Sequence, residues 1–108
     1  MIPQIHPAEL ARKLQAQEPV YLLDVRQHWE YEQCHLPGSV LIPLPELPQR
    51  LNELEVPAQA LIVVYCHHGI RSLSGAAILH QAGLSKAVSL SGGIEAWSLQ
   101  IDSSVPRY

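Results

Sequence analysis

Four short apolar runs, rich in β-branched and long aliphatic residues, alternate with polar stretches along this chain. They are "VYLLDV" (Val20 to Val25), "SVLI" (Ser39 to Ile42), "LIVVY" (Leu61 to Tyr65) and "AVSL" (Ala87 to Leu90). Unbroken apolar runs of this length are typical of strands that are buried on both faces of a parallel sheet. We expect one more short strand around Ile5. Because helical stretches separate the runs, the pattern predicts a parallel, doubly wound α/β domain.

Helical signals fill the intervals between these runs. The strongest extends from Arg71 to Ala82 and is followed by Gly83, which suits a C-terminal cap. Pro48 could begin another helix, with Leu51 and Leu54 on its buried side. Three shorter helices are expected to begin at Pro7, to lie within Gln27 to Gln33, and to follow Gly92 and Gly93.

The composition suits one globular domain over residues 1–108. The chain is 47% hydrophobic and 16% charged, which is enough apolar material for a core. Its net charge is -3 and its seven Lys and Arg residues are scattered, so no basic stripe could follow a nucleic-acid backbone. No leader is recognisable, and no apolar stretch reaches the roughly 18 residues of a membrane span. We therefore expect a cytoplasmic protein that binds neither nucleic acid nor membranes.

The stretch "YCHHGIRS" directly follows the apolar run that ends at Tyr65. Parallel α/β sheets bind ligands beyond the carboxyl ends of their strands, and Cys66 falls at such an end. A loop that enters a helix there directs several backbone N–H groups into one concavity. We therefore predict that Cys66 is held as its thiolate, with Gly69 allowing a tight turn and Arg71 adding positive charge. The alternative, a small buried apolar cysteine, stays open.

Two adjacent histidines in this loop, His67 and His68, suggest a metal site at first sight. Adjacent residues rarely point at the same ion, and no Cys or His pair has the spacing of a structural zinc site. We therefore predict neither a metal nor a cofactor. Instead, we expect one of the two histidines to add positive charge near the thiolate when it is protonated.

Two charged residues, Asp24 and Arg26, follow the first buried run. They could form charged walls of the site. We favour a structural ion pair or turn contact, with Glu30 as a further candidate partner. Trp29 and Trp97 are interpreted as packing residues.

Six short motifs follow one another along the chain. They are "LLDVR" (Leu22 to Arg26), "EY" (Glu30, Tyr31), "HLPGS" (His35 to Ser39), "IP" (Ile42, Pro43), "VVYCHHGIRS" (Val63 to Ser72) and "GGIEAW" (Gly92 to Trp97). In this order they resemble the signatures of a single-domain rhodanese, the thiosulfate sulfurtransferase homology domain. The resemblance implies a rhodanese-like α/β fold, with a five-stranded parallel sheet flanked by helices on both faces.

The resemblance also implies a site. Cys66 would be the catalytic residue and would carry a sulfane sulfur as a persulfide. Arg71 would contact the sulfonate of a donor such as thiosulfate. The residues that would bind the donor are His67, His68, Gly69, Ile70, Arg71 and Ser72.

The implied activity is that of a thiosulfate:cyanide sulfurtransferase, which takes sulfur from thiosulfate or a protein persulfide and passes it to cyanide or a thiol. A phosphatase or arsenate reductase is an alternative, but the four residues between Cys66 and Arg71 make a shorter loop than that of the cysteine phosphatases. A binding module without catalysis, or one within a sulfur relay, is another. The closing "IDSSVPRY" (Ile101 to Tyr108) is similar to tails of bacterial rhodanese domains and hints at a sulfur-carrier or sulfur-relay partner.

Cys34 departs from the family pattern, which usually has glycine before "HLPG". As a second thiol it could trap the persulfide or form a disulfide with Cys66. We favour the alternative of a neutral substitution at a turn, because two cysteines in a cytosolic chain are expected to stay reduced.

Overall fold

The five strands form one parallel sheet in the order β1-β5-β4-β2-β3, in a computed structural model that describes residues 1–108. Every strand expected from the sequence is present, including the short one at Ile5. The central strand is β4, and its carboxyl end leads into the Cys66 loop (residues 66–72). The strands are β1 (Gln4–Ile5), β2 (Val20–Asp24), β3 (Val40–Leu41), β4 (Leu61–Tyr65) and β5 (Ala87–Leu90).

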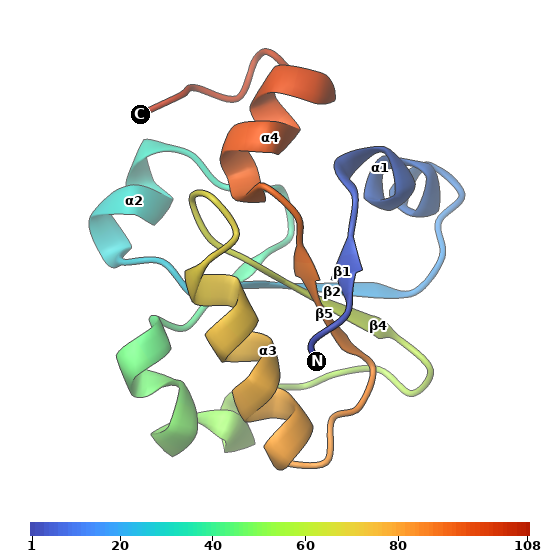
Figure 1. The fold of residues 1–108 in the computed structure, drawn as a ribbon, viewed down its shortest axis with the longest axis vertical. Coiled ribbons are helices and arrows are strands. Elements are labelled where there is room, and N and C mark those ends of the chain that lie inside the picture. The colour runs from blue at the N-terminus through green and yellow to red at the C-terminus, as the bar shows by residue number, and fades with distance from the viewer.

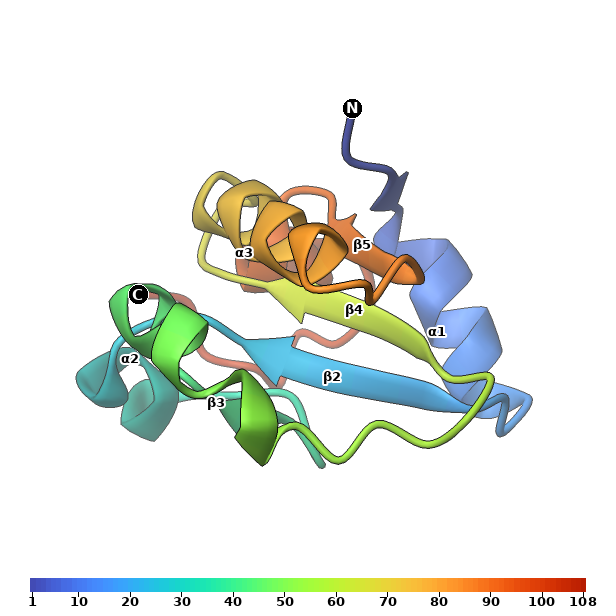
Figure 2. The same ribbon diagram turned by 90° about the horizontal axis from the view of Figure 1, so that it is seen from below.

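Helices cover both faces of this sheet, as the resemblance implied (Figures 1 and 2). Helices α1 (Pro7–Gln15) and α4 (Gly93–Gln100) contact each other on one face. Helix α3 (Arg71–Gln81) packs on the other face against the 3₁₀ helix η1 (Leu44–Gln49). The short α2 (His28–Gln33) follows β2 and lies near the C-terminus in Figure 1.

Alternate residues of the central strands build two separate cores. From β4, Val63 and Tyr65 enter the core beneath α1 and α4, whereas Ile62 and Val64 enter the core beneath α3. This alternation follows from the pleat of a strand, and it explains why the run is apolar throughout. Asp24 of β2 is in register with Tyr65 of β4, so the carboxyl ends of these strands meet at one edge of the sheet.

Helix α3 begins at Arg71, as predicted, and ends at Gln81, one residue before the predicted end. Gly83 has the left-handed φ of +91° that a C-terminal cap requires, and its N–H bonds the carbonyl of His80. The start of α3 therefore lies at the carboxyl edge of the sheet, next to Cys66. No helix in the chain is both long enough and apolar enough to cross a membrane.

The prediction of a helix beginning at Pro48 is wrong. Pro48 lies inside the 3₁₀ helix η1, and a second 3₁₀ helix, η2, spans Leu51–Glu53. The helical segment already begins at Leu44, so Pro48 is its fifth residue and not part of a first turn. At that position proline has no N–H to donate and its ring clashes with the carbonyl four residues earlier, which disfavours an α-helix. Leu51 and Leu54 nevertheless pack against the core beneath α3, as expected.

Candidate active site

The sulfur of Cys66 is enclosed at the junction of β4 and α3. The residue is only 1% exposed. The N–H of Gly69 donates to Sγ at 3.1 Å, and the N–H of Ser72 points at Sγ from 3.4 Å. Two N–H groups that converge on one sulfur at a helix start stabilise negative charge on that sulfur.

A second layer of hydroxyl groups lies beneath the sulfur. The Oγ of Ser72 is 3.5 Å from Sγ of Cys66, and it is 2.7 Å from the Oγ of Ser89 on β5. Both serines have no exposed surface. The two hydroxyl groups are thus polar neighbours of the Cys66 sulfur on its buried side, where its other neighbours belong to the apolar core beneath α3.

Glycines allow the loop to pass close to α4. Gly69 has a φ of +94°, and a Cβ there would lie 3.0 Å from the backbone nitrogen of Gly92. Gly93 has a φ of +64°, and a Cβ there would lie 2.5 Å from the carbonyl oxygen of Cys66. The first turn of α4 then fixes the loop, because Ile94 N–H donates to the Cys66 carbonyl at 2.9 Å and Glu95 N–H to the His67 carbonyl at 3.1 Å.

Arg71 forms a bidentate ion pair with Glu30 of α2. Its Nη1 is 2.7 Å from Oε1 and its Nη2 is 2.9 Å from Oε2. Hydrogen bonds from Arg71 are the main reason that the pKa of Glu30 falls from 4.5 to about 2. The expected positive charge is thus present in the loop, but its fork of donors is occupied by a carboxylate. A contact between Arg71 and a sulfur donor stays a prediction.

Asp24 and Arg26 form the ion pair that we favoured, with Nη2 and Oδ2 2.6 Å apart. Neither side chain has exposed surface, so they do not form an open wall of the site. The hydroxyl of Tyr108 links this pair to the other one: it accepts from Arg26 Nη1 at 2.8 Å and donates to Glu30 Oε2 at 2.8 Å. Glu30 therefore pairs with Arg71 and not with Asp24 or Arg26.

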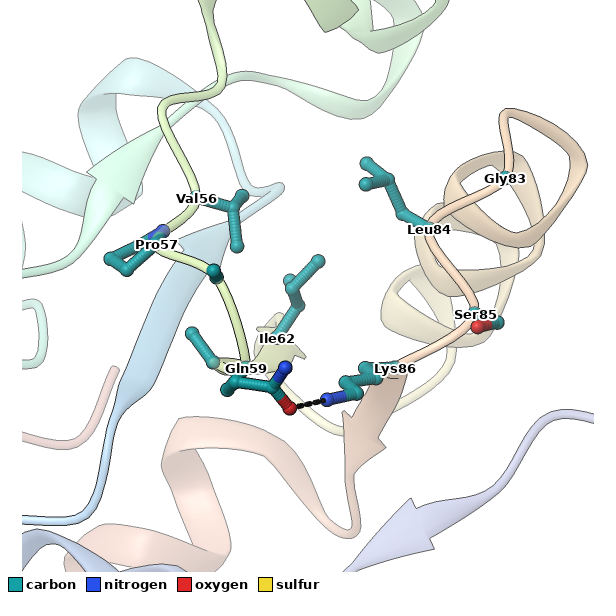
Figure 3. A pocket seen from close by; sticks show the side chains of 10 residues that line it. Val56, Pro57, Gln59, Ile62, Gly83, Leu84, Ser85 and Lys86 are labelled. Atoms are coloured by element: carbon teal, nitrogen blue, oxygen red, sulfur yellow. Dashed lines mark hydrogen bonds between the residues drawn. The ribbon is translucent and has the colours of Figure 1, made fainter.

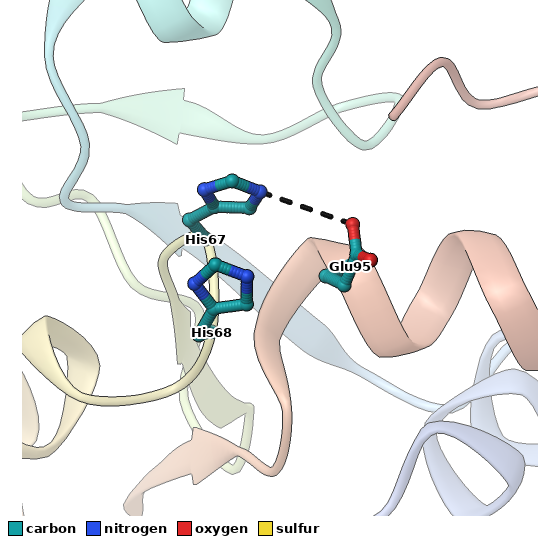
Figure 4. A group of neighbouring side chains, drawn as sticks. All are labelled: His67, His68 and Glu95. Atoms are coloured by element: carbon teal, nitrogen blue, oxygen red, sulfur yellow. Dashed lines mark ion pairs between the residues drawn. The ribbon is translucent and has the colours of Figure 1, made fainter. Parts of the chain in front are cut away.

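The rings of His67 and His68 stack with centroids 3.9 Å apart, close to Glu95 (Figure 4). Tyr108 stacks on the other side of His67 at 3.9 Å. Burial lowers the pKa of His67, and the neighbouring His68 lowers it further. The lowered pKa disfavours the protonated form of His67, and the expectation that one of the two histidines adds positive charge near the thiolate stays a prediction.

The same cluster can be tested against metal binding. One potential ligand atom from each of His67, His68 and Glu95 lies within 4.8 Å of the other two. Tetrahedral zinc with bonds of 2.0–2.1 Å needs ligand atoms about 3.4 Å apart. Because the two imidazoles stack at an interplanar angle of 23°, their lone pairs run side by side and do not converge. Arg107 binds Oε2 of Glu95 at 2.6 Å, and Oε1 lies 3.8 Å from Nε2 of His67, so the two imidazoles would have to turn before the cluster could bind a metal ion.

None of the three surface pockets of the chain includes Cys66. One pocket, of about 290 Å³, lies between Pro57 and Leu84 at the amino ends of β4 and β5, where Lys86 bonds Gln59 (Figure 3). That end of the sheet is opposite the Cys66 loop. The sulfur of Cys66 thus lies beneath the loop and outside these pockets.

Cys34 and Cys66 are both free and lie in different cores, on opposite faces of the sheet. The thiol of Cys34 lies 3.3 Å from the carbonyl oxygen of Pro106. A disulfide between the two cysteines would require one of them to leave its core. This arrangement favours the interpretation of Cys34 as a neutral substitution.

Comparison with known proteins decides the family. The model of the family described as Rhodanese-like domain matches residues 6–100. The chain belongs to the rhodanese-like domain family. This confirms the resemblance. A sulfurtransferase of Allochromatium vinosum is 34% identical over 98 residues, which are 91% of this chain and 90% of that protein.

Two further matches differ in how much of the other protein this chain covers. The adenylyltransferase and sulfurtransferase uba4 of Ogataea parapolymorpha is 38% identical over 96 residues, which are 89% of this chain and 24% of that protein. The chain thus spans only a quarter of this curated relative. The crystal structure of a rhodanese-like domain protein from Staphylococcus aureus superimposes with a TM-score of 0.80 at 29% identity and covers 99% of both chains. The fold expected from the sequence is thereby confirmed.

Sequence reasoning missed the partners that surround the loop. Glu30 was expected to pair with Asp24 or Arg26, and Tyr108 and Ser89 were given no role in the site. Their contacts join residues 41, 78 and 17 positions apart along the chain, beyond the reach of any local pattern. The one local signal is the spacing of Gln27 and Glu30, which form a capping box at the start of α2.

Proposed function

We propose that this chain is a sulfurtransferase that carries a sulfane sulfur on Cys66 as a persulfide. The donor is thiosulfate or a persulfide, and the acceptor is cyanide, a thiol or a sulfur-relay protein. The observation that carries the proposal is the convergence of the Gly69 and Ser72 N–H groups on Sγ. Membership of the rhodanese-like family supports it, as does the relative that is named a sulfurtransferase.

The reaction follows from this geometry in two steps. The Cys66 thiolate attacks the outer sulfur of the donor, a new S–S bond forms, and the donor's former bond to that sulfur breaks with its electron pair leaving on sulfite or a thiolate. The acceptor then attacks the outer sulfur of the persulfide, and the Cys66 thiolate leaves. The N–H groups of Gly69 and Ser72 stabilise the thiolate charge on Sγ before the first transfer and again after the second, when the thiolate is restored.

Two aspects of the setting belong to the same proposal. We place the reaction in the cytoplasm, where a reducing environment keeps Cys66 available as a thiol. A relay partner is suggested by the uba4 relative, whose name joins an adenylyltransferase to a sulfurtransferase. Phosphatase chemistry is disfavoured because a phosphoryl group would need the N–H donors of the loop for its own oxygen atoms. The N–H groups of Gly69 and Ser72 instead point at the sulfur of Cys66, at 3.1 and 3.4 Å.

Release of thiocyanate from cyanide tests the proposal, with thiosulfate and an organic hydropersulfide as alternative donors. The unmodified protein should release thiocyanate with at least one donor, and Cys66→Ser should abolish the release. Cys34→Ser is the matched control, because it makes the same chemical change in the opposite core. Equal release by the Cys66→Ser variant, or turnover of a generic aryl phosphate in place of sulfur transfer, would refute the proposal.

A further inference from the structure

The carboxylate of Glu30, next to the Cys66 loop, accepts four hydrogen bonds. Its Oε1 accepts from Arg71 and from the N–H of Gln27, at 2.7 and 3.0 Å. Its Oε2 accepts from Arg71 and from the hydroxyl of Tyr108, at 2.9 and 2.8 Å. The side chain of Glu30 is only 5% exposed. Releasing Arg71 would leave a buried carboxylate without its main counter-ion, which is unfavourable.

The other arginines near the loop are also paired. Arg26 is fully buried against Asp24, and Arg107 binds Glu95. An incoming anion would therefore find no arginine at the loop that lacks a carboxylate partner. A sulfonate group would have to compete with Glu30 for the fork of Arg71.

Two large apolar side chains, which we call the apolar rim, are exposed next to the residues of the Glu30–Arg71 ion pair. Trp29 is 55% exposed and immediately precedes Glu30, and Ile70 is 73% exposed and immediately precedes Arg71. Trp29, which we interpreted as a packing residue, contacts the ring of Tyr108 edge-on at 5.8 Å and donates from Nε1 to Oε1 of Gln27 at 3.1 Å, but more than half of the residue is exposed. Exposed apolar side chains beside an ion pair of zero net charge can contact the carbon chain of an organic donor. They offer nothing to a dianion such as thiosulfate.

We propose that Glu30 is a specificity-determining residue, which holds Arg71 as an ion pair and so makes the Cys66 loop prefer organic persulfides over thiosulfate. This inference rests on the proposed function and names the donor class for the same site. It follows from the four hydrogen bonds on the Glu30 carboxylate and from the apolar rim.

The two donors differ in their leaving groups. With a hydropersulfide, R–S–SH, Cys66 Sγ bonds the outer sulfur, the S–S bond breaks, and its electron pair leaves as RS⁻ while the proton stays on the transferred sulfur. With thiosulfate, the bond to the sulfonate sulfur breaks and its electron pair leaves on a sulfite dianion. Only sulfite, the leaving group of thiosulfate, has charged oxygen atoms that a cation would stabilise. The guanidinium group of Arg71 is already hydrogen-bonded to Glu30 and is not free to do so.

The test compares kcat/KM for thiosulfate with kcat/KM for the hydropersulfide of N-acetylcysteine methyl ester, with cyanide as the acceptor for both. The unmodified protein should prefer the hydropersulfide. Glu30→Gln should free Arg71 for the sulfonate and shift the ratio toward thiosulfate by about tenfold, as one charged hydrogen bond allows. Glu46→Gln is the matched control and should not move the ratio, because it weakens an ion pair with Arg50 on the exposed surface.

A double variant keeps the test decisive if Glu30→Gln fails to fold. The double variant Glu30→Gln/Arg71→Gln replaces an ion pair of zero net charge with two uncharged side chains. It should keep the ratio of kcat/KM for the two donors that the unmodified protein has. If Arg71 binds the sulfonate directly, the double variant should instead lose thiosulfate selectively. A preference of the unmodified protein for thiosulfate, or an unchanged ratio in folded Glu30→Gln, would overturn the inference alone. Absence of sulfur transfer from both donors would refute the proposed function as well.

Discussion

Replacing Gly93 with alanine should displace the Cys66 loop, because the new Cβ has no room. It would lie 2.5 Å from the carbonyl oxygen of Cys66 and would also press on the carbonyl of His67. Ordinary van der Waals contact begins at about 3.4 Å, so backbone atoms must move by about 1 Å. Gly38 provides the matched control, since its φ of +80° is also left-handed but a Cβ there meets nothing within 4 Å.

The size of the effect follows from these contacts. Alanine at a left-handed φ costs about 1–2 kcal/mol at either position. At Gly93 the displacement also weakens two hydrogen bonds from the start of α4, those of Ile94 N–H and Glu95 N–H, at about 1 kcal/mol each. We therefore expect Gly93→Ala to lower the free energy of unfolding by about 3–4 kcal/mol and Gly38→Ala by about 1–2 kcal/mol.

Urea denaturation followed by circular dichroism measures this difference, with an unchanged m-value as the check on two-state behaviour. A displacement of about 1 Å at a reacting group can slow a reaction by about 10²-fold, so sulfur loading of Gly93→Ala should slow by a similar factor. The reasoning is refuted if Gly93→Ala is no less stable than Gly38→Ala and loads sulfur at the same rate.

Three further predictions concern the polar network and the second cysteine. Asp24→Asn should destabilise the fold by about 3–5 kcal/mol, because it leaves the fully buried Arg26 without its counter-ion; a loss below about 1 kcal/mol in thermal or urea unfolding would contradict this. Because the pKa of Glu30 falls from 4.5 to about 2, its ion pair should contribute stability in full above pH 4.5 and lose it as the pH falls toward 2. Linkage puts this contribution at about 3 kcal/mol, and Glu30→Gln should lack that part of the acid dependence in unfolding measured against pH. Cys34→Ser should change stability by less than about 1 kcal/mol and leave sulfur loading unchanged, and peptide mapping under mild oxidation should find no disulfide between Cys34 and Cys66.

The parts of the structure that depend on local sequence could be predicted. The run that ends at Tyr65 identifies β4, the central strand, and the glycine and arginine that follow place Cys66 between a strand end and a helix start. The segment around Pro48 was misjudged because proline suits the first turn of an α-helix, whereas the helical segment begins four residues earlier, at Leu44. Only packing against the core beneath α3 selects between these two starting positions.

The partners of the loop could not be predicted, because they come from distant parts of the chain. Arg71 is a free cation when only its neighbours in sequence are considered, and its pairing with Glu30 depends on how β2 leads into α2. The sequence around His67 gives no sign that the ring of Tyr108, 41 residues later, stacks on its imidazole. The chemistry of Cys66 is therefore encoded locally, whereas the charges around it are set by the tertiary fold.

The central claim is that Cys66 carries the transferred sulfur, and intact mass measurement of the protein tests it most directly. After treatment with thiosulfate or an organic hydropersulfide, the protein should gain the mass of one sulfur atom, and a reductant should remove it. Peptide mapping should place the added sulfur on Cys66, and Cys66→Ser should gain nothing while Cys34→Ser gains the full mass. No gain with either donor, or an equal gain in Cys66→Ser, would contradict the account.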